Sequence, residues 1–247
     1  MSKVIILGSA NAIPDEQHDN THMVVVSDKR VVLIDCVSNP LARLKHARVP
    51  VEGLTDLVLT HFHPDHISGV PLLLMDLWLL GRKEPLNVYG LAYTLDRVEK
   101  MMELYNWESW PNFFEVIFHR LPEQAMQVLI DDADLRVLAS PVRHLIPTIG
   151  VRIDFPIAEK AFAYSCDTEP TQAVVELAAG VDVLVHEAAG ASKGHSSARQ
   201  AGEIARSAEA GALYLIHYPT AEERAQGLIE EAQQTYPGPV ALAKDWQ

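Results

Sequence analysis

The chain opens with short apolar runs and continues with apolar runs that alternate with longer amphipathic stretches. The first runs, over residues 4–7, 23–27 and 30–35, predict strands, and Asp28-Lys29 between the last two is typical of a tight hairpin turn. Further apolar runs predict strands over residues 57–60, 114–120, 127–130, 136–139, 151–155, 161–165, 181–185, 213–216 and 240–243.

Helical periodicity and helix-end residues mark most of the segments between these strands. Pro170 lies in the first turn of one predicted helix and Gly180 follows its end. Strands first, then strands alternating with helices, favour an α/β or α+β fold with helices packed outside the sheets. The helices are predicted over residues 41–47, 69–80, 91–105, 170–179 and 198–210, with a last one after the capping-box pair Thr220 and Glu223.

Length and composition favour one globular domain spanning residues 1–247, because the sequence shows no repeat, low-complexity tract or linker. The net charge of −13 repels nucleic acid and anionic membranes, so an activity on nucleic acid needs a local positive feature such as metal ions. Two cysteines exclude a disulfide scaffold. The apolar stretch 70–80 is too short to cross a bilayer, and the N-terminus resembles a strand more than a signal peptide. These features predict a cytoplasmic protein without membrane contact.

The segment after the predicted strand 57–60 carries the strongest chemical signal. His61, His63, Asp65 and His66 form an H-x-H-x-D-H pattern, which arises by chance in roughly one such sequence in a thousand. A turn after a rigid strand can aim His61 and His63 at one point, and Asp65 and His66 at a neighbouring one. Neutral imidazoles and a carboxylate suit zinc, with manganese or iron as alternatives.

One loop cannot complete two coordination spheres, and three further ligand types stand at the ends of other predicted strands. They are His144, Asp167 and His217. Site residues gather at the carboxyl ends of strands in α/β folds. In this order, and together with the first motif, Asp167 is best interpreted as a carboxylate that bridges two metal ions.

This series of residues resembles the metallo-β-lactamase superfamily. Its H-x-H-x-D-H loop is followed by a single His, a single Asp and a single His, and Asp35 at the end of the strand 30–35 matches the family's first motif. The resemblance runs from Lys3 to about Asp245 and implies an αββα sandwich, two sheets back to back with helices outside, around a centre of two divalent ions. It implies that one ion is held by His61, His63 and His144 and the other by Asp65, His66 and His217, with Asp167 bridging.

Three further segments resemble the ribonuclease Z-like phosphodiesterases of that superfamily. They are the Gly-rich opening over residues 8–14, the His186-Glu187-Ala188 segment, and His195-Ser196-Ser197, which resembles a helix-capping segment with a phosphate-facing histidine. The resemblance implies a hydrolase of phosphodiester bonds, an endonuclease at an RNA end or an enzyme for a smaller molecule.

The same resemblance suggests a role for each residue near the metal loop. In this hypothesis Asp65 orients the attacking hydroxide and handles its proton, and two metal ions neutralise the phosphoryl charge. His195 donates a hydrogen bond to the phosphoryl oxygen or the leaving group, and Glu187 orients His195. Asp35 supports the metal loop from behind.

Two features separate the chain from that branch. The run Cys36-Val37-Ser38-Asn39-Pro40 replaces a run that contains Gly and Gln there. The segment between His144 and Asp167 leaves room for a hairpin but not for a long tRNA-binding arm. Because the net charge of −13 also suits tRNA poorly, a small phosphodiester is as good a substrate as an RNA end.

Two other functions would share these metal ligands. One is a hydrolase of another ester, such as a lactone, a thioester or a sulfate ester, and the other is a metal-binding or sensing protein without catalysis. His195 and its Ser-Ser context favour phosphate, and a complete ligand set with a candidate proton donor argues against a sensor. Cys36 and Cys166 are expected to be reduced and buried near the site. The aromatic segment 101–118 predicts core, a lid or the contact of a homodimer.

Overall fold

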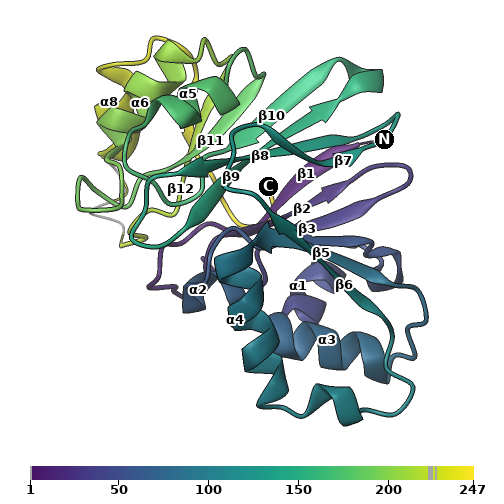
Figure 1. Ribbon diagram of the computed structural model, residues 1–247. Coiled ribbons are helices and arrows are strands. Elements are labelled where there is room, and N and C mark those ends of the chain that lie inside the picture. The colour runs from purple at the N-terminus through teal and green to yellow at the C-terminus, as the bar shows by residue number, and fades with distance from the viewer. Residues whose placement is uncertain (1, 222–224, 226) are drawn as a thin grey trace.

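The computed structural model describes residues 2–221, 225 and 227–247 and consists of two β-sheets packed face to face (Figure 1). The first sheet has the order β1-β2-β3-β4-β5-β6, antiparallel from β1 to β3 and parallel from β3 to β6. These strands are β1 (Lys3–Gly8), β2 (His22–Val26), β3 (Val31–Ile34), β4 (Asp56–Val58), β5 (Leu86–Leu91) and β6 (Val116–Leu121).

The second sheet has the order β13-β12-β11-β10-β9-β8-β7, antiparallel from β7 to β10 and parallel from β10 to β13. Antiparallel hairpins therefore come first in each sheet, and crossover helices join the later parallel strands. The strands are β7 (Gln127–Asp131), β8 (Arg136–Val142), β9 (Thr148–Phe155), β10 (Lys160–Tyr164), β11 (Val183–Glu187), β12 (Leu213–Ile216) and β13 (Val240–Leu242).

Helices cover the outer face of each sheet, which gives the four layers that the family resemblance implies (Figure 1). On the first sheet these are α1 (Pro40–His46), α3 (Val70–Leu79) and α4 (Ala92–Glu103), with the short α2 (Pro64–Ile67) at the sheet's end. On the second they are α5 (Gln172–Leu177), α6 (Ala198–Ser207) and α8 (Leu228–Gln233). Single turns of 3-10 helix span Val51–Gly53, Trp107–Ser109 and Pro156–Ala158.

Three apolar layers hold this sandwich together. Alternate residues of both sheets, such as Ile34 and Val151, meet between the sheets, and opposite residues face the helices. Helix α6 shows how local sequence supports the packing. Ser197 caps its first turn in a capping box with Gln200, and Ala201 and Ala205 lie buried against the second sheet's outer face.

The structure corrects several of the predicted element boundaries. Strand β5 was not predicted, because Asn87 and Gly90 interrupt its apolar pattern. Strand β11 continues to Glu187, so His186 lies inside the strand and not beyond it. Helix α5 begins after Thr171, whose side chain accepts from the Ala173 N–H, and Pro170 therefore precedes the helix. Of the predicted capping pair Thr220 and Glu223, Glu223 lies outside the described residues.

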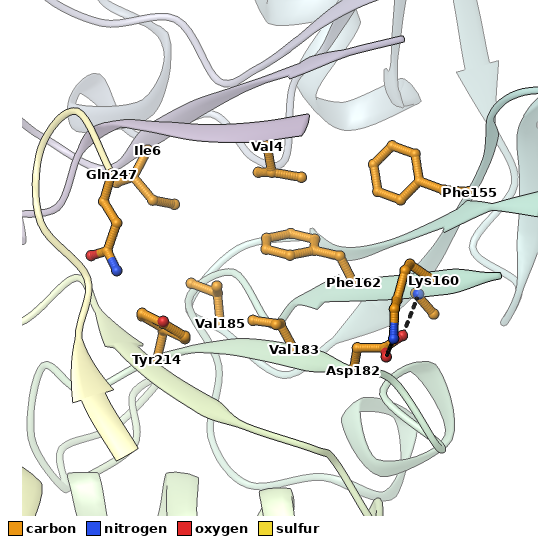
Figure 2. A pocket seen from close by; sticks show the side chains of 11 residues that line it. Val4, Ile6, Phe155, Lys160, Phe162, Asp182, Val183, Val185, Tyr214 and Gln247 are labelled. Carbon is orange, nitrogen blue, oxygen red and sulfur yellow. Dashed lines mark hydrogen bonds and ion pairs between the residues drawn. The ribbon is translucent and has the colours of Figure 1, made fainter. Parts of the chain in front are cut away.

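At one end of the molecule the sheets leave a cavity of about 320 Å³ between β1 and strands β10 to β12. Figure 2 shows Phe155, Phe162 and Val183 around this space, and the ion pair of Lys160 with Asp182 at its edge. The described residues include no helix with the length and hydrophobicity that a membrane crossing requires.

Candidate metal centre

The carboxyl ends of several strands meet at one edge of the sandwich, and each chain segment turns sharply as it leaves its strand. Asp35, Cys166 and His217 follow β3, β10 and β12 with φ angles of 60°, 54° and 52°. This left-handed backbone is sparsely populated by residues with a side chain and is held in place by its surroundings. The turns direct side chains from both sheets toward a common space.

One group of three imidazoles lies in this space. His61 Nε2 is 3.0 Å from His63 Nδ1, and His144 Nε2 is 3.1 Å from the same atom. His61 and His63 come from the loop after β4, and His144 comes from the segment that follows β8 in the other sheet. Three ring nitrogens that all lie within 4.8 Å of one another could hold one metal ion.

A second group combines a carboxylate with two imidazoles. His66 Nε2 lies 3.6 Å from Asp65 Oδ2, and His217 Nε2 lies 4.0 Å from the same oxygen. Asp65 and His66 belong to α2, and His217 follows β12. This group too has the spacing of a metal site.

Asp167 lies between the two groups and is 2% exposed. Its Oδ2 is 3.9 Å from both His61 Nε2 and His144 Nε2 and 3.3 Å from His217 Nε2. Its Oδ1 is 3.6 Å from His66 Nε2. The structure thus brings together all seven residues that were predicted from the sequence as metal ligands.

The donor set fits divalent metal ions. His66 Nε2 and Asp167 Oδ1 are buried and have no hydrogen-bond partner in the described part of the chain, although buried polar atoms are normally paired. Burial lowers the pKa of His61 well below its usual value and that of His217 to about 4, which keeps both rings neutral as ligands must be. These unpaired atoms and neutral rings are what a buried cation would engage.

In four of the five candidate histidine ligands, the ring nitrogen that points away from the ligand group contacts another residue. His66 Nδ1 is 2.7 Å from Asp35 Oδ2, and His144 Nδ1 is 2.7 Å from the Gly194 carbonyl. The other two contacts are His61 Nδ1 to Thr60 Oγ1 at 3.1 Å and His217 Nδ1 to Thr21 Oγ1 at 3.3 Å. Such partners fix the tautomer and orientation of metal-binding imidazoles. The Asp35 contact places this residue behind the metal loop, as predicted.

Glu187 and His195 form a pair at the rim of this cluster. His195 Nδ1 is 3.0 Å from Glu187 Oε1, and the His195 ring is 20% exposed. Burial raises the pKa of Glu187 to about 7, and the bond to Glu187 raises the pKa of His195. The Glu187 carboxylate also accepts backbone hydrogen bonds, which favour its ionised form and leave the shared proton on His195. The backbone donors are Thr168, Ala189 and Ser196.

The sequence did not predict the residues that contact the candidate ligands from distant parts of the chain. Thr21 and Gly194 belong to this set, since nothing in their local sequence marks them as neighbours of a histidine.

Cys166, expected near the site, has its Sγ 3.6 Å from His61 Nδ1 and is a free thiol, as is the buried Cys36. In the aromatic segment, Trp107 and Phe113 pack on the first sheet's outer layer.

Comparison with known proteins identifies the family of this chain. The profile of the β-lactamase superfamily domain matches residues 30–218. The chain therefore belongs to the metallo-β-lactamase superfamily, a family of metal-dependent hydrolases. Ribonuclease Z of Methanothermobacter thermautotrophicus is 25% identical over 96% of this chain and 93% of its own length, and it is a distant homologue.

Two solved structures show the same fold. The metallo-β-lactamase fold protein YhfI from Bacillus subtilis superposes with a TM-score of 0.84 at 23% identity, covering 100% of this chain and 97% of its own. The short form of human tRNase Z superposes with a TM-score of 0.77 at 23% identity, covering 100% of this chain and 98% of its own. Both likenesses extend over the complete sandwich.

Proposed function

We propose that the protein is a metal-dependent phosphodiesterase with a centre for two divalent ions, zinc in the first instance and manganese or iron as alternatives. The observation that carries the proposal is the position of Asp167 between two groups of three ligands. His61, His63 and His144 would hold one ion, Asp65, His66 and His217 the other, and Asp167 would contact both. When bound, two such ions supply Lewis acidity and lower the pKa of water beside a phosphoryl group.

The residues around the ions would divide the remaining work. The Asp65 side chain is 15% exposed, so its carboxylate can orient a water molecule and hold its proton. His195 uses Nδ1 for Glu187, which leaves Nε2 to donate to a phosphoryl oxygen or to the leaving oxygen. The ring centroid of His195 lies 4.9 Å from that of His144 and 6.0 Å from that of His217, beside a member of each ligand group.

The substrate that we propose is a small phosphodiester or the end of an RNA chain. Strands β9 and β10 with the turn Pro156–Ala158 form an antiparallel hairpin that fills the segment between His144 and Asp167, as the sequence predicts. No long arm is therefore inserted at this point of the chain. The net charge of −13 also favours a substrate whose negative charge is confined to the group that meets the ions.

The test is hydrolysis of bis(p-nitrophenyl) phosphate by the purified protein with zinc or manganese added. His63→Ala serves as the blank, and His46→Ala, a histidine stacked on Trp246 away from the ligand groups, serves as the matched control. We expect turnover by wild type and H46A and none by H63A. Binding of two ions without hydrolysis, accompanied by turnover of a lactone, a thioester or a sulfate ester, would replace the proposal with that activity.

A further inference from the structure

The loop between β1 and β2 returns to the candidate metal centre and joins the end of β12. The backbone of Ala10 lies between Asn20 and Tyr218, with a β-bridge to each. The His217 N–H donates to the Ser9 carbonyl at 2.9 Å, and the Asn11 N–H donates to the Tyr218 carbonyl at 3.2 Å. This loop therefore holds the left-handed turn at His217 from its backbone side.

Thr21 extends this contact to the His217 side chain. It is fully buried, and its hydroxyl donates to the Ala10 carbonyl at 2.8 Å. Because the hydroxyl proton is committed to that carbonyl, the hydroxyl oxygen is left to accept from His217 Nδ1 at 3.3 Å. His217 then carries its proton on Nδ1 and presents the lone pair of Nε2 to the ligand group.

The same arrangement occurs at a second histidine of the cluster. Thr60 Oγ1 donates to Asp35 and lies 3.1 Å from His61 Nδ1. Thr60 is the neighbour of His61 in sequence, whereas Thr21 lies 196 positions from His217. A contact between residues so distant in sequence depends on the loop that carries Thr21.

That loop is anchored by the carboxyl-terminal segment of the chain. Asp245 accepts from the Ser9 hydroxyl at 2.8 Å and from the Asp19 N–H at 3.0 Å, and it pairs with Arg43. The Asp245 side chain is only 3% exposed. Ser9 thus joins Asp245 to the backbone of His217, and the loop is fixed at both ends.

We propose that Thr21 is a positioning residue that sets the tautomer and orientation of His217 and thereby the affinity of the Asp65, His66 and His217 group for its ion. The inference rests on the proposed function. Loss of such a partner weakens metal binding by about 10–100-fold in other proteins. The expected effect of removing the Thr21 hydroxyl is a loss of that size for one of two ions.

The first test measures zinc affinity by competition with a chelator, using metal-free protein. Thr21→Val keeps the side-chain volume and removes the hydroxyl, and Thr21→Ser restores the hydroxyl. Thr55→Val is the matched control. The Thr55 hydroxyl hydrogen-bonds the Val31 backbone at the amino-terminal ends of β3 and β4, whereas the candidate ligands follow the carboxyl ends of the strands. We expect T21V to bind one ion 10–100-fold more weakly than wild type, and T21S and T55V to keep both affinities. Unchanged affinities in T21V would overturn the inference.

The second test requires neither a variant of Thr21 nor a measurement of hydrolysis. Nitrogen-15 spectra of metal-free wild type at neutral pH, with the His217 signals assigned by comparison with His217→Gln, report which ring nitrogen carries the proton. The inference predicts a proton on Nδ1, and a proton on Nε2 would contradict it. If wild type binds two ions but hydrolyses no phosphodiester, the proposed function fails and the Thr21 result stands on its own.

Discussion

At the carboxyl ends of β10 and β12, imidazoles and carboxylates fill the space between the two sheets, whereas at the opposite ends of β10 and β11 the sheets leave a cavity of about 320 Å³. The cavity is lined mainly by apolar side chains such as Phe162 and Val183. Its charged groups, Lys160 and Asp182, already satisfy each other at 2.6 Å. Strands β10 and β12 contribute to both regions, and the two ends differ in the side chains that they carry.

Open volume alone therefore does not mark the end of this fold where the candidate ligands gather. The cavity has space, but its two charged groups pair with each other, and this pairing raises the pKa of Lys160 and lowers that of Asp182, so both stay ionised. The opposite end has buried polar atoms without hydrogen-bond partners among the described residues, imidazoles at His61 and His217 that burial keeps neutral, and the carboxylate of Asp167 between the ligand groups. Converging polar groups with perturbed pKa values are typical of functional sites.

Removal of the carboxylate between the two ligand groups gives the largest expected effect. Asp167→Ala should lower kcat/KM for a phosphodiester by about a thousand-fold or more and reduce the bound metal, because the ions supply several kcal/mol of charge stabilisation. Asp182→Ala removes a carboxylate from the cavity end and should leave activity unchanged. Equal losses of kcat/KM in D167A and D182A would contradict the assignment of the reaction to the carboxyl ends of the strands.

Truncation of the rim histidine should have the next largest effect. His195→Ala removes the donor to the phosphoryl or leaving oxygen and should lower kcat by about 10²–10⁴-fold. The ligand groups remain, so the metal content measured by elemental analysis should not change. A rate equal to that of wild type would exclude His195 from the reaction.

The pH profile should change when the partner of His195 loses its charge. The bond to Glu187 raises the pKa of His195, so the protonated ring survives to higher pH and is lost as pH rises through that pKa. Glu187→Gln removes the negative charge, and the descending limb of kcat/KM against pH should move to lower pH. A limb that stays in place would show that another group titrates there.

The smallest effect is expected at the cavity. Val183→Ile adds one methylene where Figure 2 shows open space, and should raise the free energy of unfolding by up to about 1 kcal/mol. Urea denaturation measures this change, and phosphodiester hydrolysis should stay at the wild-type rate. A loss of activity in V183I would connect the cavity to the metal centre.

The packing of helices outside the sheets and the seven candidate ligands could be predicted because their signals are local, and the four-layer sandwich followed from the family resemblance. The residues from His61 to His66 form a compact motif, and His144, Asp167 and His217 each follow an apolar strand. The position of Thr21 beside His217 could not be predicted, because it depends on how a loop after β1 meets the end of β12. Strand β5 was missed for a related reason, since its pairing with β4 and β6 outweighs the weak strand propensity of Gly90.

A titration of metal-free protein with zinc, followed by hydrolysis of bis(p-nitrophenyl) phosphate at each addition, tests the central claim most directly. The proposed two-ion centre predicts that activity rises until two equivalents are bound, and that D167A and H63A stay inactive throughout. Hydrolysis that persists in the presence of excess chelator, or two bound equivalents without hydrolysis, would contradict it.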